Sequence, residues 1–187
     1  MQPATRPAIT MGGISIQSLG AANVDALRQL SVDTFTDTYA RYNTQEDMFL
    51  YINKHFSAEQ LLTEIKEACN FFFGAFSNDG QMVGYVKLRT SEKPAELATL
   101  KHIELERIYV SKAYHGKGLG SVIMQHCLAF ALQQHYEVLW LGVWTKNEKA
   151  MAFYKKWGFE IFGKHTFMLG KDAQVDWLMK KHLNIPQ

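Results

Sequence analysis

The sequence predicts a mixed α/β fold, and three observations support this. Residues 44–66 contain two helix-start patterns, residues 71–89 contain two strand-like runs joined by a turn, and residues 102–144 read as strand, helix and strand. A short turn makes neighbouring strands antiparallel, whereas a strand–helix–strand unit makes them parallel with a right-handed crossover. The central sheet is therefore expected to contain both kinds of pairing.

Composition predicts one domain, residues 14–187, after a flexible lead-in at residues 1–13. A chain of 187 residues with 47% hydrophobic residues has enough apolar side chains for a single core. The net charge of +2 argues against a broad nucleic-acid-binding face. Cys69 and Cys127 have no metal-ligand spacing, so we expect reduced, partly buried thiols in a cytoplasmic protein, with a disulfide as the lesser alternative. We expect no membrane span and no secretory signal.

The first third of the domain is expected to be mainly helical. Residues 14–19 resemble a short strand, and Asn23 then has the residue type of a helix cap. Thr44 and Ser57 each begin a four-residue pattern with the spacing of a capping box, followed by apolar residues at helical intervals. Three helices are therefore predicted before residue 70.

A hairpin is predicted next, because aromatic and β-branched runs flank the turn residues Asn78, Asp79 and Gly80. Residues 91–101 form a polar connection. The strand that follows, "HIELERIYV", changes its apolar phase: Ile103 precedes the change at an odd position and Ile108 follows it at an even one. A strand with period two needs an extra residue to do this, so a β-bulge is predicted at Glu106-Arg107.

The last third is predicted to contain two more helices and three more strands. Apolar residues keep helical spacing from Gly118 to His135, and "VLWLGVW" then reads as a buried strand parallel to "HIELERIYV". Asn147 has the type and position of a cap for the next helix, which Gly158 ends. "FEIFGKH" and "QVDWLMKKHL" supply the final two strands.

The stretch "YHGKGLG" has two interpretations on its own. Gly116, Gly118 and Gly120 permit either an ordinary strand-to-helix turn or a loop whose backbone N–H groups bind an anion at a helix start. The Gly-Lys-Ser/Thr of a nucleoside triphosphatase loop is absent from the sequence. The position of the loop late in the chain also differs from that of a dinucleotide-binding fingerprint.

The combination of "LERIYV", "YHGKGLG" and "NEKAMAFYKKWGF" resembles the GNAT superfamily of acetyl-CoA-dependent N-acetyltransferases. His115 stands where that family's loop usually has Gln or Arg, and the glycines match. More narrowly, "LSVDTFTDTYARYNTQEDMFLYINKHFSAEQL" and "LWLGVWTKNEKAMAFYKKWGF" are similar to the bacterial PaiA-type spermidine/spermine N-acetyltransferases. The resemblance implies a GNAT fold: a twisted mixed sheet of six to seven strands with helices on both faces, whose parallel strands at about 102–110 and 138–143 splay apart.

The resemblance also implies which residues bind acetyl-CoA. Backbone groups of one strand would meet the pantetheine arm, and the glycine loop would surround the pyrophosphate. A role as helix cap alone would also explain Asn147. Exposure to solvent would also explain Lys149 and Lys156 on the helix that follows it. The implied coenzyme contacts are Ile108, Tyr109, Val110, His115, Gly116, Lys117, Gly118, Leu119, Gly120, Ser121, Asn147, Lys149, Ala150, Phe153 and Lys156.

The same resemblance assigns three catalytic candidates. Tyr154 would protonate the departing thiolate as general acid, although its helix face also fits a core aromatic. A thiol pKa near 8.5 lies below the tyrosine pKa of about 10, so the tyrosine keeps its proton to donate. Glu104 is the first candidate for the base that deprotonates the amine and Glu106 the second; an exposed strand face paired with Arg107 is the alternative for both.

The acceptor is expected to be a small-molecule amine, with a polyamine favoured. Such a cation needs carboxylates and aromatic side chains, and a peptide, a lysine side chain or an aminoglycoside remains an alternative, as does a non-catalytic acetyl-CoA-binding module. No metal is expected, because the seven histidines lack ligand spacing. By family analogy, a homodimer is one expectation for the oligomeric state. The candidates for the acceptor groove are Asp33, Asp37, Tyr39, Glu104, Glu106, His165 and Asp176.

Overall fold

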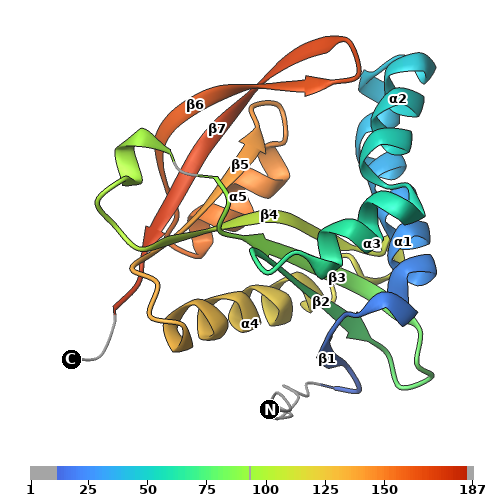
Figure 1. The fold of residues 1–187 in the computed structure, drawn as a ribbon, viewed down its shortest axis with the longest axis horizontal. Helices are drawn as coiled ribbons and strands as arrows, with labels where there is room; N and C mark the ends of the chain where they lie inside the picture. Colours follow the sequence, from blue (N-terminus) through green and yellow to red (C-terminus); the bar gives the residue numbers. More distant parts are fainter. Residues whose placement is uncertain (1–11, 93, 185–187) are drawn as a thin grey trace.

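One seven-stranded sheet organises the domain (Figure 1). The computed structural model describes residues 12–92 and 94–184, so residues 1–11 of the expected lead-in lie outside the described part. The strand order is β1-β2-β3-β4-β5-β7-β6, and β4 with β5 is the parallel pair, as predicted. The strands are β1 (Ser15–Ser18), β2 (Asn70–Phe76), β3 (Met82–Arg89), β4 (His102–Val110), β5 (Val138–Trp144), β6 (Glu160–Leu169) and β7 (Asp172–His182).

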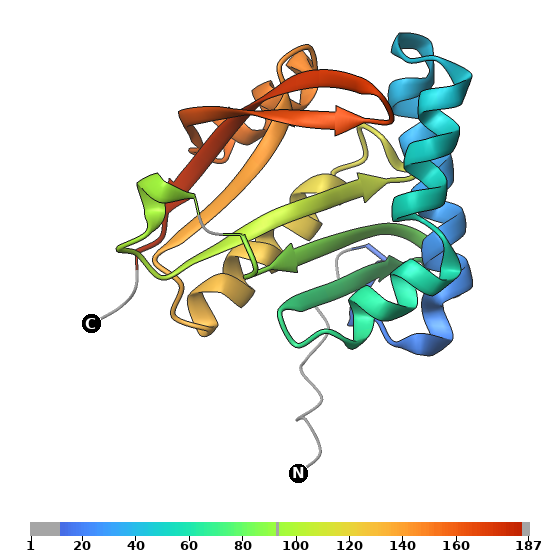
Figure 2. The same cartoon turned by 45° about the horizontal axis from the view of Figure 1, so that its top comes forward.

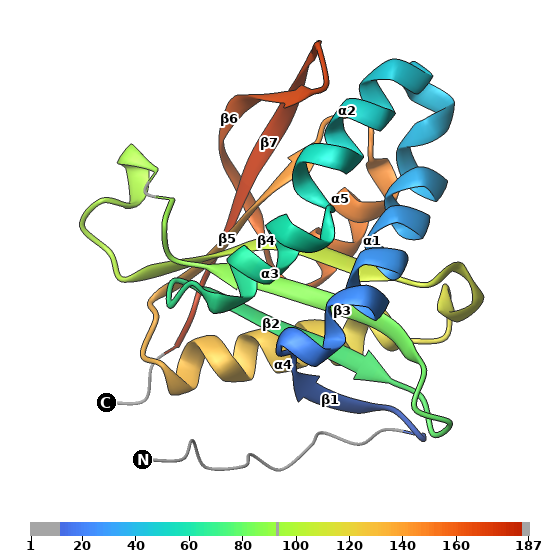
Figure 3. The same ribbon diagram turned by 45° about the vertical axis from the view of Figure 1, so that its right-hand side comes forward.

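Helices cover both faces of this sheet, which confirms the predicted mixed α/β architecture (Figure 3). One face carries α1 (Val24–Tyr39), α2 (Gln45–His55) and α3 (Ala58–Lys66), and the other carries α4 (Leu119–Gln133) and α5 (Glu148–Lys156). None of the helices found in the described residues combines the length and the apolar character that crossing a membrane would need.

Local side-chain chemistry explains most of the helix starts. The side chains of Thr44, Ser57 and Asn147 each accept a hydrogen bond from the backbone N–H three residues later, as the capping patterns predict. Asn23 precedes α1, but the prediction that its side chain caps that helix is wrong. Its Oδ1 accepts a hydrogen bond from the Gly20 N–H instead, because the chain first makes a short 3-10 turn there.

The predicted bulge in β4 is confirmed by the register. Lys87 lies opposite Arg107 and Leu88 lies opposite Leu105, so Glu106 is the extra residue. The bulge lets β4 keep apolar side chains on the α4 face both before and after the phase change. It also places its charged residues on the face that α1 and α3 cover, which is the face of the candidate site.

The parallel strands pair briefly and then separate. β4 and β5 are in register at His102, Ile103 and Glu104, and the paired residues end at Glu104 and Trp140. Figure 2 shows the two strands diverging beyond this point. β5 nevertheless stays paired with β7 through Trp144. The divergence therefore opens the middle of the sheet, while its outer strands remain paired.

Two large apolar clusters hold the layers together. One joins α4 and α5 to the sheet, and the other joins α1, α2 and α3 to the opposite face. Fully buried Leu, Ile or Phe side chains contribute roughly 1.5–3 kcal/mol each to folding. A smaller cluster around Leu97 and Trp140 anchors the connection that leads into β4. Cys69 and Cys127 are both free; Cys69 is partly buried, as predicted, whereas Cys127 is fully buried.

Candidate active site

A cavity of about 870 Å³ lies where β4 and β5 separate. Its walls come from α1, α2, the end of β3, β4, the glycine loop, β5, α5 and the β6–β7 hairpin. The residues predicted from sequence as coenzyme contacts or catalytic groups that line it are Glu104, Glu106, Ile108, Tyr109, Val110, His115, Gly116, Gly118, Leu119, Gly120, Ser121, Asn147, Lys149, Ala150, Phe153 and Tyr154.

Lys117 and Lys156 are not part of the cavity lining. The Nζ atom of Lys117 instead lies 5.5 Å from the centre of the Tyr114 ring, a cation–π contact at the surface. Lys156 lies on the exposed side of α5, so solvation explains it. Lys112, which the sequence reasoning missed, lines the cavity together with Lys149. Two positive charges therefore lie in the part of the cavity that the glycine loop borders.

The glycine loop brings backbone N–H groups to one end of the cavity. Gly116 and Gly118 have φ angles of 74° and 84°, a left-handed conformation that favours glycine. Gly118 is the N-cap of α4, and its carbonyl accepts from the amides of Ser121 and Val122. The first amides of a helix have no acceptor within the helix, and its dipole adds partial positive charge there. The loop therefore has the chemistry of an anion site.

His115 fixes this loop to the end of β4. Its Nε2 atom lies 2.8 Å from the carbonyl oxygen of Val110. A carbonyl oxygen accepts hydrogen bonds, so Nε2 is the protonated nitrogen of this ring. The histidine therefore positions the loop relative to the strand edge, a role that the sequence did not indicate.

Glu104 is a buried carboxylate at the point of divergence. Its residue is 5% exposed, so the alternative of an exposed strand face is wrong. Burial raises the pKa of Glu104 above its ordinary value, and the neighbouring Arg89, which donates through Nε to its carboxylate, opposes that rise without cancelling it. A carboxylate with a raised pKa accepts a proton more readily than an ordinary one.

Glu106 has the opposite electrostatic environment. Its carboxylate lies 2.7 Å from Lys87 Nζ, 3.3 Å from Arg89 Nε and 3.2 Å from Arg107 Nη2. Burial acts to raise the pKa of Glu106, but Arg107, Lys87 and Arg89 together lower it below its usual range. A carboxylate stabilised in its ionised form is a weak proton acceptor, so the electrostatics favour Glu104 over Glu106 as a base.

Arg107 and Glu64 form the core of this charged cluster. The guanidinium of Arg107 donates to both carboxylate oxygens of Glu64, at 2.8 and 3.1 Å, and Lys87 Nζ lies 3.0 Å from the same carboxylate. Glu64 comes from α3, far from β4 in sequence. Burial acts to raise the pKa of Glu64, and Arg107 and Lys87 lower it overall. The cluster keeps the bulged strand fixed beneath the cavity.

Tyr154 approaches the cavity from the opposite face of the sheet. It is 7% exposed and belongs to the apolar cluster of α4 and α5, yet it also lines the cavity. Its position is therefore compatible both with a core aromatic and with a general acid. Burial raises the pKa of Tyr154 above its ordinary value, and the neighbouring Cys127 adds to the rise. The hydroxyl thus stays protonated at neutral pH.

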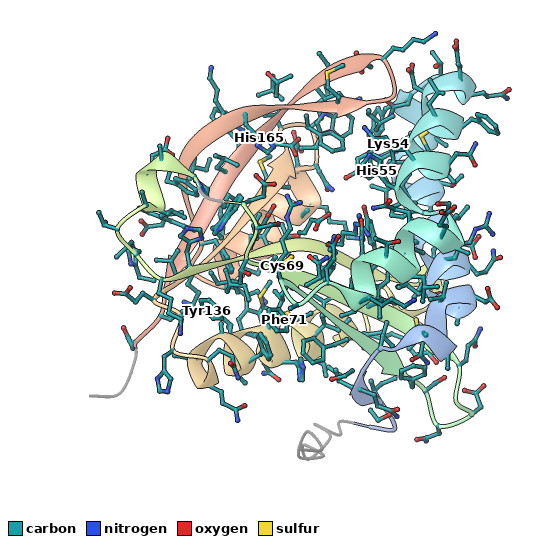
Figure 4. All side chains as sticks on the ribbon, in the orientation of Figure 1. Lys54, His55, Cys69, Phe71, Tyr136 and His165 are labelled. Carbon is teal, nitrogen blue, oxygen red and sulfur yellow. The ribbon has the colours of Figure 1, made fainter. Side chains whose placement is uncertain are left out.

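The other end of the cavity carries carboxylates and aromatic rings. Asp37, Tyr39 and Asp176 line it, as predicted, whereas Asp33 does not. Asp33 accepts a hydrogen bond from Gln29 on the exposed side of α1. Figure 4 labels two histidines that line this end, His55 on α2 and His165 on β6. Burial lowers the pKa of His55 to about 4, so it is neutral at physiological pH.

Several lining residues escaped the sequence reasoning. Arg89 ends a strand, and Tyr51 and Phe167 come from α2 and β6, elements that periodicity alone does not bring together. Among the described residues there is no group of three or more His, Cys, Asp or Glu side chains arranged to hold a metal ion. The lining residues missed are Thr34, Phe35, Thr38, Arg41, Tyr51, His55, Arg89, Leu105, Arg107, Lys112, Tyr114, Gly142, Val143, Trp144, Phe167 and Gln174.

Comparison with known proteins agrees with this geometry. Residues 24–159 match the acetyltransferase (GNAT) family. An uncharacterized N-acetyltransferase of Lactobacillus delbrueckii subsp. lactis is 34% identical, over 92% of this chain and 99% of that protein. The spermidine N(1)-acetyltransferase of Thermoplasma acidophilum is 25% identical, over 79% of this chain and 89% of that one.

A solved structure shares the fold. It is the PaiA N-acetyltransferase from Thermoplasma acidophilum in complex with coenzyme A, with a TM-score of 0.75 and 24% identity over 90% of this chain and 98% of that one. The family match spans the glycine loop, the split between β4 and β5 and the helix of Tyr154. The chain therefore belongs to the GNAT family of acetyltransferases, whose acetyl donor is acetyl-CoA.

Proposed function

We propose that this enzyme transfers the acetyl group of acetyl-CoA to a primary amine of a polyamine such as spermidine or spermine, by direct attack within a ternary complex. One observation carries the proposal: Glu104 and Tyr154 line the same cavity from opposite faces of the sheet, at the split between β4 and β5. An amine and a thioester held in that split would have a base on one side and an acid on the other.

Coenzyme binding is assigned to the glycine loop, the edge of β4 and the start of α5. The loop amides and the side chains of Lys112 and Lys149 suit the negative charge of a pyrophosphate. Ile108, Tyr109 and Val110 pair with β3 on one side, and their other edge faces the split. A pantetheine arm bound there would use that edge as an added strand does.

The reaction follows from these positions. Glu104 takes a proton from the bound ammonium, directly or through water, because a free amine with a pKa near 10.4 is mostly protonated at neutral pH. The amine then attacks the thioester carbonyl, and the C–S bond breaks as Tyr154 protonates the departing sulfur. The proton that the nitrogen loses on forming the amide restores the Tyr154 hydroxyl. The cysteines support direct transfer, since neither Cys69 nor Cys127 lines the cavity and Cys127 is fully buried.

The acceptor end supports a cationic amine. Asp37 and Asp176 supply negative charge, and Tyr39, Trp144 and Phe167 supply aromatic faces. Carboxylates together with aromatic rings are the surroundings in which ammonium groups bind. The relative from Thermoplasma acidophilum that is named for spermidine acetylation adds weight to a polyamine over other amines.

The test is a turnover screen that detects the free thiol released from acetyl-CoA. Spermidine, spermine, a peptide N-terminus, a lysine peptide and an aminoglycoside are offered under the same conditions. The highest kcat/KM is expected with a polyamine. Activity on peptides without activity on spermidine would replace the acceptor, and coenzyme binding without thiol release from any amine would favour a non-catalytic binding module.

A further inference from the structure

Two side-chain oxygens on β7 lack hydrogen-bond donors at the acceptor end of the cavity. They are Gln174 Oε1 and Asp176 Oδ1, and neither has a hydrogen-bond partner among the described residues, although both atoms are hidden from solvent. Gln174 is 8% exposed and the Asp176 side chain is 14% exposed, and both residues line the cavity. They are two positions apart on one strand, so both side chains leave the same face.

The orientation of the Gln174 amide is fixed by its neighbours. Its Nε2 donates to Asn43 Oδ1 at 2.7 Å and to Asp172 Oδ2 at 2.9 Å. Asn43 in turn donates through Nδ2 to the carbonyl of Tyr39 at 2.8 Å, which fixes its own orientation. An amide flip would point Oε1 at two other acceptors. These bonds fix the position of the Gln174 oxygen, which is an acceptor without a donor among the described residues.

Asp176 is a carboxylate whose one ionic contact among the described residues is with His165, whose Nε2 lies 3.7 Å from Oδ2. No lysine or arginine in that part of the chain forms an ion pair with it. Glu104 and Glu106, by contrast, are each in contact with at least one arginine. Leaving a buried acceptor unsatisfied is costly, so native proteins usually pair such atoms. A ligand with N–H donors and positive charge would supply both the hydrogen-bond donors that the two oxygens lack and a cationic partner for Asp176.

The walls around these two oxygens suit a cation. In the register of the hairpin, Gln174 lies opposite Phe167 and Asp176 opposite His165, and on its other side Asp176 lies opposite Trp144 of β5. The rings of Trp144 and Tyr39 lie 5.9 Å apart. An ammonium attracted to a carboxylate and an amide oxygen would thus also meet aromatic faces.

The β7 oxygens are separate from the proposed base. Glu104 pairs with Trp140, whereas Asp176 pairs with Trp144, and a Cβ built at Gly142 between them would lie 3.5 Å from Asp176 Oδ2. Because the Asp176 side chain reaches back to Gly142, its carboxylate lies about two residues along β5 from Trp140 and about one strand spacing from β4. These two steps place it roughly 8 Å from the Glu104 backbone. That separation fits two amino groups of one alkyl chain.

We propose that Gln174 and Asp176 form a subsite that binds a second, non-reacting ammonium group of the acceptor. This inference rests on the proposed function and specifies its substrate class, an amine with at least two positive charges. The Asp176 side chain lines the cavity, and the last torsion of a carboxylate has a broad energy well, so the carboxylate can turn toward a bound ammonium. Gly142 leaves the space in which the alkyl chain would pass.

The test compares putrescine with butylamine, which has the same carbon chain and one amino group fewer. Asp176→Asn keeps the shape and removes the charge, and Gln174→Leu removes the acceptor oxygen. Asp25→Asn, on the exposed start of α1, is the matched control. For Asp176→Asn we expect KM for putrescine to rise tenfold or more, with KM for butylamine and for acetyl-CoA unchanged. Gln174→Leu should show a smaller rise of the same selectivity.

Two results would overturn the subsite: equal KM values for putrescine and butylamine in the wild-type enzyme, or equal effects of Asp176→Asn on both amines. If neither amine is acetylated, calorimetric titration of putrescine into protein saturated with coenzyme A decides instead. Putrescine binding that Asp176→Asn abolishes would leave the subsite standing while the proposed function fails. Absence of putrescine binding to the wild type would remove the subsite.

Discussion

Arg89 on β3 lies directly opposite Glu104 on β4, and its Nε donates a hydrogen bond to the Glu104 carboxylate. The same guanidinium lies 3.3 Å from Glu106 and 3.7 Å from Glu92. Arg89 therefore connects the proposed base to two further carboxylates. Among the described residues Arg89 is the cation in contact with Glu104, since Lys87 and Arg107 contact Glu106 and Glu64 instead.

Replacing Arg89 with Met should move the acid limb of the pH profile to higher pH. Burial already raises the pKa of Glu104, and removing the opposing positive charge of Arg89 raises it further. Glu104 must be ionised to act as a base, so activity would be lost at a higher pH than in the wild type. The measurement is kcat/KM for the acceptor against pH. Arg89→Lys keeps the charge and should stay near the wild-type profile; an unmoved limb in Arg89→Met would remove Glu104 from that role.

Tyr154→Phe should fold and bind acetyl-CoA yet lose at least tenfold in turnover. The change removes the proton that the departing thiolate needs, while the ring keeps its packing against Phe153 and Phe159. Thiol release gives kcat, and a coenzyme titration gives the affinity. Tyr136→Phe, at a partly buried position outside the cavity lining, is the control and should retain wild-type turnover. Unchanged turnover in Tyr154→Phe would leave this residue a packing role alone.

Two glycines of the loop should respond differently to alanine. Gly118 has a left-handed φ of 84°, so Gly118→Ala should lower the free energy of unfolding by about 1–2 kcal/mol. Gly120 lies within α4, and an added Cβ would meet the Phe153 ring at 3.7 Å, an ordinary contact. Gly120→Ala should be neutral or stabilising by up to about 1 kcal/mol. Urea unfolding of the two variants checks the difference, and equal losses would contradict it.

Arg107→Met should be strongly destabilising because it leaves Glu64 and Glu106 buried with one cation fewer. Breaking a buried ionic cluster in this way typically costs about 3–5 kcal/mol. The double variant Glu64→Gln with Arg107→Met should recover part of the loss, because it removes one uncompensated charge. Urea unfolding supplies the comparison, and additive losses in the double variant would show that the two side chains do not interact.

The same cluster predicts how stability depends on acid. The folded pKa values of Glu64 and Glu106 are lowered, so the stability they contribute is present above their ordinary value of about 4.5 and is lost as pH falls through the folded values. The wild type should therefore lose stability below about pH 4.5. In Arg107→Met the folded pKa values move up toward the unfolded ones, so stability should depend less on pH in that range. Urea midpoints at several acidic pH values test this.

Local patterns predicted the elements and the bulge, because period, capping and turn chemistry depend on neighbouring residues. The phase change between Ile103 and Ile108 located the bulge at the residue that the register shows as extra. The glycine loop and Tyr154 were identifiable because their motif is contiguous in sequence.

Long-range side-chain pairings were not predictable in this way. Glu64 and Arg107 are 43 positions apart, and no local sequence pattern around either residue indicates that they pair. Lys87 is a local indication of this charged cluster, because it lies between the apolar residues Val86 and Leu88 of a buried strand. A lysine at such a position requires a charged partner. Gln174 was not predicted as a site residue, because its unpaired oxygen is identified only from the hydrogen bonds that fix the amide orientation, and these come from Asn43 and Asp172.

The split between β4 and β5 creates strand edges inside the sheet. Edges normally lie at the margin, where exposed main-chain groups invite pairing with another chain and promote aggregation. Here the edge of β4 beyond Glu104 is recessed beneath α1 and the β6–β7 hairpin, and its bulge interrupts the regular spacing that a foreign strand would need. The interrupted edge is thus a poor template for strand pairing with a second copy of the chain.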